Sequence, residues 1–322
     1  MLLSRQEMTF DFGGEKLCPV KDKDVLAWAT HQFLYGEMTG IQIGHWLYRA
    51  PDLDAARFLS RQAVEEFQHV GNFLRILSII GAKPEPAHPV VRFLATGAMP
   101  DTWEEHVAME MALGEGLVLQ AFYALVDTVD HEEIVAILKR GVRQEERHVD
   151  FGEKRTMRAI EGKPWLRRRL LGQALITLFA VGRLESFMKK RLPMTHPVLR
   201  RLPDFVRFTV SRAELRMLRM GLLDRPLAEI PLRERALLVA EAYAGKAASS
   251  AAHRAFVAPL QNFGLFRAKR LTDTYLDDPM VKDGLLGPQT SADISESNVE
   301  SDADNKRAMA STSKSRSAAG QA

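Results

Sequence analysis

The sequence predicts an all-α protein: a four-helix bundle with a long crossover between its two halves, followed by a C-terminal helical extension. Four segments with apolar residues near helical spacing indicate this, at about 24–49, 53–80, 103–128 and 132–160. Short turns join the first segment to the second and the third to the fourth, whereas a long proline-containing stretch separates the second from the third. Two short hairpins around one long connection are typical of one class of four-helix bundle.

The segment boundaries carry residues that begin and end helices. Asp52 follows Pro51 and is placed to cap the second helix, which ends at Gly81 before a stretch with three prolines. Thr102 and Glu105 have the spacing of a capping box at the start of the third helix. The boundaries therefore agree with the periodicity.

The two halves of the predicted bundle also form a weak internal repeat. Residues 33–37 (Phe-Leu-Tyr-Gly-Glu) parallel residues 111–115 (Met-Ala-Leu-Gly-Glu), and residues 66–70 parallel 145–149. The two offsets differ by a single position, and only two copies exist. This pattern predicts a pseudo-twofold bundle and not a solenoid.

Composition divides the chain into an irregular N-terminal segment (1–22), the bundle (23–162), a basic helical extension (163–276) and a disordered tail (277–322). The apolar content of 46% and the charged content of 26% are ordinary for a soluble globular protein. The single cysteine, Cys18, excludes a disulfide framework and a thiolate metal cage. Because polar and charged residues, and not the apolar core of a secretory signal, follow residues 1–5 (Met-Leu-Leu-Ser-Arg), we expect a cytoplasmic protein.

Two Glu-x-x-His motifs organise the chain, namely Glu66 with His69 and Glu145 with His148. On a helix each pair lies one turn apart on one face, where a carboxylate and an imidazole can share a metal ion. A further glutamate precedes each motif, and the spacing from Glu37 to Glu66 matches that from Glu115 to Glu145 to within one position. With a turn midway in each hairpin, both glutamates return to one level, roughly 21 Å from the turn. Four carboxylates and two imidazoles then converge on one dinuclear metal site, whose predicted ligands are Glu37, Glu66, His69, Glu115, Glu145 and His148.

With these ligands in the order Glu, Glu-x-x-His, Glu, Glu-x-x-His, residues 24–161 resemble the ferritin-like diiron-carboxylate proteins. The run from Glu115 through Tyr123 to residues 141–153 is similar to aldehyde-deformylating oxygenases, although those are smaller and lack a basic extension. No tyrosine follows His69 within residues 70–73, where a ribonucleotide reductase small subunit would carry its radical. Gly141 stands where arylamine N-oxygenases have a third histidine. The resemblance therefore implies a ferritin-like diiron protein without fixing its substrate.

The choice of ligands leaves alternatives within each motif. Glu65 and Glu146 neighbour the chosen acids, but only Glu66 and Glu145 both stand three residues before a histidine. Glu115 is preferred over Glu110, which lies five positions earlier and about 140° around an α-helix, and over Glu104 and Glu105. The glycines flanking Glu115 are expected to leave room beside it. In the related family an acid before each motif glutamate accepts a hydrogen bond from a ligand imidazole; Glu65 and Gln144 occupy those places here, so the second departs from the usual acid.

A carboxylate-rich site with one imidazole per metal suits iron or manganese better than zinc or copper. The resemblance implies an enzyme, a non-haem diiron oxygenase or oxidase that activates dioxygen to oxidise a small apolar organic substrate. Its cofactors would be two iron ions, or a Mn/Fe pair, with an external electron donor such as a ferredoxin or a reductase. The alternatives are a ferritin-like ferroxidase, a transfer-RNA hydroxylase of the same superfamily, and a scaffold without metal.

Positive charge is concentrated between residues 154 and 220, where Lys and Arg greatly outnumber the four acids. The apolar stretch 170–182 within this segment is too short to cross a bilayer. The plain interpretation is a buried helix with solvated ends. The alternative is a surface for an acidic partner or a membrane face, which would make the protein peripheral to a membrane. No RNA-binding motif supports a nucleic-acid partner.

Overall fold

The computed structural model describes residues 1–40, 44–92, 95, 100–189, 192, 194–256 and 275–282. Within these ranges the protein is all-helical and contains no strand, only an isolated β-bridge between Leu17 and Val129. Its principal elements are α1 (Arg5–Met8), α2 (Lys23–Gly40), α3 (Gly44–Tyr48), α4 (Leu53–Ile79), α5 (Pro89–Arg92), α6 (Trp103–Glu105), η3 (His106–Gly114), α7 (Glu115–Thr128), α8 (Glu132–Ile160), α9 (Pro164–Met188), α10 (Pro197–Arg200), α11 (Leu202–Arg219), η4 (Leu227–Glu229), α12 (Leu232–Phe256), η5 (Tyr275–Asp277) and α15 (Pro279–Lys282).

The long helices of residues 23–160 pack around one apolar core. Helix α2 packs on α4, and α8 packs on α4, α7 and η3. The ring of contacts closes through Phe33 of α2, which stacks on Phe73 of α4 and meets Phe122 of α7 edge-on at 5.0 Å. These helices surround the residues predicted above to be metal ligands.

Two helix starts follow the expected capping chemistry. The carboxylate of Asp52 accepts a hydrogen bond from the backbone N–H of Ala55 at 2.8 Å, which begins α4. The hydroxyl of Thr102 accepts one from Glu105 N–H at 3.2 Å. The carboxylate of Glu105, however, accepts from Asp101 N–H and not from that of Thr102, so only half of the expected capping box forms.

Two expected helices are more interrupted than the sequence indicated. The first, expected over 24–49, is divided into α2 and α3, and residues 41–43 between them lie outside the described part. The third, expected over 103–128, is continuous, but its residues His106–Gly114 form a π-helix between two α-helical ends. Of the described helices, Trp103–Thr128 alone is long and apolar enough to span a membrane, with 39% of its apolar window buried. The core helix of a soluble protein has the same properties, and this helix packs along α8.

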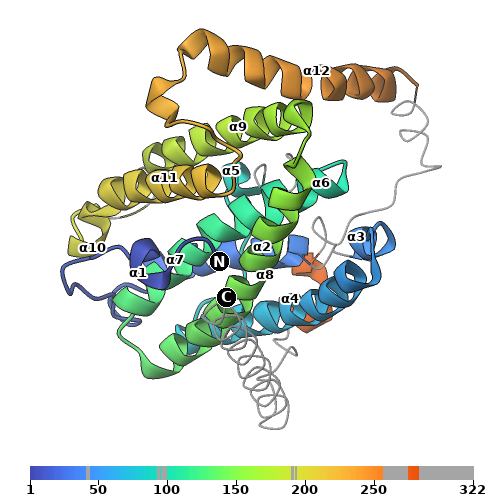
Figure 1. Cartoon of the computed structure of the whole chain (residues 1–322). Coiled ribbons are helices and arrows are strands. Elements are labelled where there is room, and N and C mark those ends of the chain that lie inside the picture. The colour runs from blue at the N-terminus through green and yellow to red at the C-terminus, as the bar shows by residue number, and fades with distance from the viewer. Residues whose placement is uncertain are drawn as a thin grey trace, which may run out of the picture.

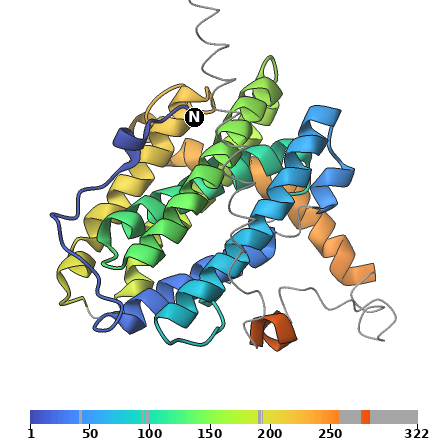
Figure 2. The ribbon, with the colours of Figure 1, turned by 90° about the horizontal axis from the view of Figure 1, so that it is seen from below.

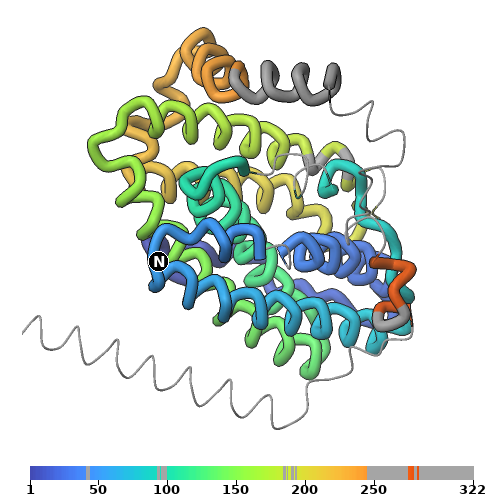
Figure 3. Tube along the Cα trace, turned by 90° about the vertical axis from the view of Figure 1, so that its right-hand side faces the viewer, coloured from blue at the N-terminus to red at the C-terminus, as the bar shows by residue number. Residues whose placement is uncertain are grey.

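The extension forms a layer on one side of this group of helices. Figure 1 shows α12 lying over α9, with α11 beside α9 and α4 on the far side of the molecule. The tube view in Figure 3 shows the same order from another direction. A second apolar cluster joins the layer to η3 through buried side chains such as Leu113, Leu170, Met217 and Leu238. The extension is therefore packed on the helix that leads into Glu115.

The N-terminal segment 1–22 is more structured than the expected irregular lead-in. Leu3, Met8, Phe12 and Leu17 are buried in the main core. The segment runs beside α11, as Figure 2 shows, and then reaches the α7–α8 turn, where Leu17 N–H donates to Thr128 O at 2.7 Å. It thus joins the extension to the helices around the site.

The tail expected at 277–322 lies outside the described residues beyond 282. Residues 279–282 form α15, and Val281 is buried against the main core. The expected disorder of the remainder stays a prediction.

Candidate metal centre

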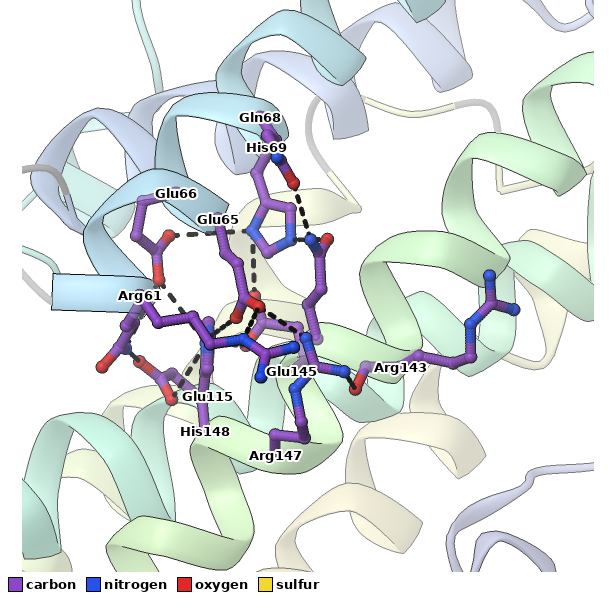
Figure 4. A network of polar contacts seen from close by, with 12 residues as sticks. Arg61, Glu65, Glu66, Gln68, His69, Glu115, Arg143, Glu145, Arg147 and His148 are labelled. Carbon is purple, nitrogen blue, oxygen red and sulfur yellow. Dashed lines mark hydrogen bonds and ion pairs between the residues drawn. The ribbon is translucent and has the colours of Figure 1, made fainter. Parts of the chain in front are cut away.

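The six candidate ligands come from four helices and lie together in the interior. Glu37 comes from α2, Glu66 and His69 from α4, Glu115 from the first position of α7, and Glu145 and His148 from α8. Five of them are buried, and the side chain of Glu115 keeps 21% exposure. Figure 4 shows Glu66, Glu115 and Glu145 grouped with the two histidines. The helices therefore bring together every residue that the spacing predicted.

The six residues form two ligand groups that share one carboxylate. Glu37, Glu66, His69 and Glu145 make one group, and Glu66, Glu115 and His148 make the other. Within each group one ligand atom per residue lies within 4.8 Å of the others. Glu66 belongs to both because its Oε2 is 3.7 Å from His69 Nδ1 and its Oε1 is 3.5 Å from His148 Nδ1. Glu66 can therefore bridge two cations.

Glu145 also reaches both histidines. Its Oε1 is 3.2 Å from His69 Nδ1, and its Oε2 is 3.6 Å from His148 Nδ1. Glu37 Oε2 lies 3.1 Å from His69 Nδ1, whereas Glu115 Oε2 lies 3.9 Å from His148 Nδ1. The arrangement thus has two carboxylates between the imidazoles and one outer carboxylate beside each.

Three buried atoms of this cluster have no hydrogen-bond partner among the described residues. They are Glu115 Oε2, Glu145 Oε2 and His148 Nδ1. An unpaired buried polar atom costs about 1–3 kcal/mol, more when it is charged. All three atoms belong to residues of the two ligand groups, so cations bound at the cluster would satisfy them together. The donor set of carboxylate oxygens and imidazole nitrogens fits such a cation.

The imidazole of His69 is oriented by two glutamines. Its Nε2–H donates to Gln144 Oε1 at 2.9 Å, and the amide nitrogen of Gln144 donates to Gln68 Oε1 at 2.8 Å. A carbonyl oxygen only accepts, so Nε2 carries the hydrogen and Nδ1 faces the carboxylates. Gln144 therefore selects the nitrogen of His69 that is available to a metal.

The imidazole of His148 is oriented by a carboxylate instead. Its Nε2–H donates to Glu65 Oε2 at 2.7 Å. The other oxygen of Glu65 accepts from Arg61 at 2.9 Å and from Arg147 at 2.6 Å. Figure 4 shows Glu65 between these arginines and His148. Glu65 thus contacts the histidine of the opposite motif and not His69 of its own helix.

Protonation in the metal-free protein follows from this burial and proximity. Burial raises the pKa of Glu37 and Glu115 well above the ordinary value, which favours the protonated form of both carboxyls. Burial acts against the charged imidazoles, but the neighbouring carboxylates outweigh it and raise the pKa of His69 and His148 well above the usual range. All four shifts therefore favour the protonated forms in the metal-free protein.

The remaining acids stay ionised. Burial alone would raise the pKa of Glu66 and Glu145, but the neighbouring imidazoles of His69 and His148 lower the pKa of the first and bring that of the second to about 2. The pKa of Glu65 is likewise lowered to about 2, since His148 and Arg147 offset its burial. Two carboxylates then balance two imidazolium groups at the centre.

The π-helix changes one geometric expectation made from the sequence. The backbone N–H of Glu115 donates to Glu110 O, five positions earlier, so these residues are about one turn apart. The separation of about 140° expected on an ideal α-helix is therefore wrong at this place. Glu110 lies near Glu115 and helps to raise its pKa. Its own carboxylate contacts His106 Nδ1 and belongs to neither ligand group.

Other acids weighed against the ligands have structural partners. Glu105 is fully buried and pairs with Arg169 at 2.6 Å and with the amide of Gln173 at 2.7 Å. Glu146 accepts from Arg5 and from the hydroxyl of Tyr123. Both acids therefore hold surrounding segments in place.

Gly116 does not serve the purpose expected of the glycines that flank Glu115. A Cβ on Gly116 would lie 1.8 Å from a guanidinium nitrogen of Arg216, so this glycine makes room for a side chain of the extension. Arg216 is 1% exposed and donates to Glu153 at 2.9 Å. The close approach fixes α11 against the first turn of α7.

Sequence reasoning missed Gln62, which is buried next to the ligands. Its amide nitrogen donates to Glu115 Oε1 at 2.8 Å and lies 3.4 Å from Glu66 Oε1. Gln62 stands four positions before Glu66 on α4, so its place on the same helix face was a usable signal.

A small apolar pocket borders the centre on the far side of His69. Phe73, Phe122, Ile137 and Leu138 line it, together with Asn72, His69 and Gly141. A Cβ on Gly141 would lie 3.2 Å from the Phe122 ring and 3.9 Å from His69 Nε2. The missing side chain at 141 therefore helps to keep this space open.

The sequence matches no known protein-family model and no curated protein. The functional conclusion therefore depends on the geometry of the centre alone.

Proposed function

We propose that this protein is a dinuclear metal oxidoreductase that uses dioxygen to oxidise a small apolar organic substrate. The observation that carries the proposal is the sharing of Glu66 between two Glu/His ligand groups. A single metal site needs no such bridge, whereas two cations held at one centre do. The proposal includes a ferritin-like architecture, with α2–α4 and η3/α7–α8 as its two hairpins and residues 81–102 as the crossover.

The residues divide the work of holding two ions. Glu37 and His69 would bind one ion, Glu115 and His148 the other, and Glu66 and Glu145 would lie between them. Four carboxylates match the charge of two divalent ions, which limits the electrostatic cost of burial. Two ferrous ions, or a Mn/Fe pair, would supply the electrons that dioxygen needs.

The surroundings of the centre favour organic substrate oxidation over iron storage. The pocket beside His69 is lined mainly by aromatic and aliphatic side chains. A ferroxidase would be served by an acidic access path for iron, and the walls of this pocket carry no acid. These walls suit a small apolar molecule, but the pocket has room for only about one water molecule, so a substrate would have to widen it.

Anaerobic titration with ferrous iron, followed by oxygen, tests the proposal. We expect two irons per chain, one oxidation event, and no mineral growth. Hundreds of irons retained per chain would instead establish iron storage, and failure to bind iron or manganese would refute a metal centre.

Two variants test whether the iron binds at the proposed ligands. Glu66→Ala removes the shared carboxylate and is expected to abolish the paired stoichiometry. Glu146→Gln changes a neighbouring acid that contacts Arg5 and Tyr123, so it should still bind two irons. If both variants lost iron binding equally, the assignment of the ligands would be contradicted.

A further inference from the structure

Oxidation of a substrate by the proposed centre requires electrons from outside the protein. Inserting one oxygen atom of O2 into a C–H bond consumes two electrons and two protons and releases one water. Iron held by these residues would return to the ferrous state only when a donor supplied those electrons. The need for a donor rests on the proposed function, whereas the place where it would bind follows from the surface of the protein.

A short chain of contacts joins the protein surface to the candidate ligand His148. The guanidinium of Arg147, whose side chain is 31% exposed, donates to Glu65, and Glu65 accepts from His148 Nε2 at 2.7 Å. Arg61, 35% exposed, contacts the same carboxylate from α4. Only the buried Glu65 thus separates this surface from a candidate metal ligand.

The surface at this place is strongly basic. Residues 134–144 of α8 contain three basic residues and no acid. Arg57 and Arg61 lie one turn apart on α4, as do Lys139, Arg143 and Arg147 in succession on α8, and Glu65 joins the two helices through Arg61 and Arg147. We call these five basic residues and Arg140 the basic seam. Figure 4 shows Arg143 pointing away from the metal cluster.

Little negative charge offsets the seam. Among the described residues, the acids at its two ends are already paired, Glu133 with Arg75 and Asp54 with Arg155. The pKa of Arg140 is lowered by burial and by the charge of Arg143, as expected where positive groups crowd together. The seam therefore carries excess positive charge.

The basic segment predicted from the sequence, residues 154–220, has more of its positive charge neutralised. Many of its cations are engaged within the molecule: Arg167 with Asp224, Arg168 with Glu241, Arg169 with Glu105, Arg207 with Asp204, Arg216 with Glu153 and Arg219 with Glu7. An acidic partner would have to displace these pairs. The seam offers positive charge with less of that competition.

An apolar side chain lies within the seam and favours a protein partner over a polyanion. Val64 is 58% exposed and stands one turn after Arg61 on α4. Protein interfaces combine an apolar centre with a charged rim, whereas phosphate backbones are bound mainly by charge.

We propose that the basic seam between α4 and α8 is the docking surface for an acidic one-electron donor protein, which delivers electrons beside the Glu65–His148 contact. Long-range attraction between the seam and an acidic surface would speed encounter, and this effect weakens as salt screens the charges.

The test uses the full, metal-loaded chain with two acidic probes, a reduced [2Fe–2S] ferredoxin and a reduced flavodoxin. The variant Lys139→Glu/Arg143→Glu reverses two exposed charges that have no side-chain ion pair among the described residues. The control Lys163→Glu/Arg233→Glu makes the same change in net charge at exposed positions of the α8–α9 turn and α12. Thermal unfolding confirms that each variant is folded.

Titration calorimetry gives the affinity, and stopped-flow spectroscopy gives the rate of reduction at low and high salt. We expect the seam variant to lose about tenfold or more in association rate at low salt, with the control within about twofold. The difference should shrink in about 0.5 M salt, where screening removes surface attraction.

The proposal is overturned if the wild-type chain binds neither probe, if both variants lose binding equally, or if the seam variant loses nothing. It is also overturned if seam charges govern binding of an oligonucleotide or anionic vesicles but not of the probes. Binding can be repeated on metal-free protein, which separates the two proposals. Seam-dependent docking without a metal pair would sink the proposed function alone, and seam-independent reduction would sink the docking surface alone.

Discussion

Loading the proposed centre with two divalent ions should release protons, up to four in number. In the metal-free protein, the raised pKa values favour protonated Glu37 and Glu115 and charged His69 and His148. Metal binding requires these two carboxyls to ionise and each imidazole to lose one proton. The four protons are thus exchanged for four positive charges on the metals, and the buried cluster stays near neutrality before and after binding.

The sign and size of the pH dependence follow from this exchange. Protons compete with metal, so affinity falls as pH falls while the pH is below the raised pKa values. Four protons correspond to a factor of about 10⁴ in the pair binding constant per pH unit, or about 5 kcal/mol. Calorimetric titration with Mn²⁺ in two buffers of different ionisation enthalpy measures the number released.

The variant Glu37→Gln provides the matched test. It removes one of the four releasable protons and should lower the measured release by one. Release of fewer than about two protons by the wild-type protein would refute the charge-balance reasoning. So would an unchanged release in the variant.

Three further outcomes are expected. Arg216→Met strips the buried Glu153 of its cation and should lower the free energy of unfolding by about 3–5 kcal/mol, while adding Glu153→Gln recovers most of it; equal urea stability of the single and double variants would contradict this. Glu65→Gln should weaken metal binding about 10–100-fold because it no longer offers a charged acceptor to His148, and an unchanged dissociation constant would exclude that role. The metal-free protein should lose thermal stability as pH rises above about 6.5, the ordinary histidine pKa, toward the raised pKa values of His69 and His148, since both groups bind more protons folded than unfolded. Metal-loaded protein should lack this slope, and identical melting profiles would show that the cluster does not titrate.

The sequence was most informative where local signals were strong. Helix α4 begins and ends within one residue of expectation, and α8 matches the expected range. Both carry long amphipathic patterns, and α4 also has the Asp52 cap. The six proposed ligands followed from repetition of one motif at matched spacing, because helical rise converts spacing into position.

Features that depend on contacts between distant segments could not be predicted in this way. Gly116 accommodates Arg216, which lies far along the chain and comes from a different helix layer. The π-helix before Glu115 has no sequence signature, and it altered the position of Glu110 relative to Glu115. Each depends on how the extension and η3 pack, which is a tertiary property.

The internal repeat makes the two halves of the centre alike, yet it leaves the two histidines in different electrostatic surroundings. His148 donates to the ionised Glu65, whereas His69 donates to the neutral amide of Gln144. An anionic acceptor increases the basicity of an imidazole more than a neutral one does, so His148 would be the stronger donor to its metal. His148 is also the histidine nearer the basic seam, because Arg61 and Arg147 of the seam contact its acceptor Glu65. Because a more electron-rich ligand favours the higher oxidation state, the ion bound by His148 would be oxidised more readily, and the metal pair would be inequivalent despite its symmetric ligands.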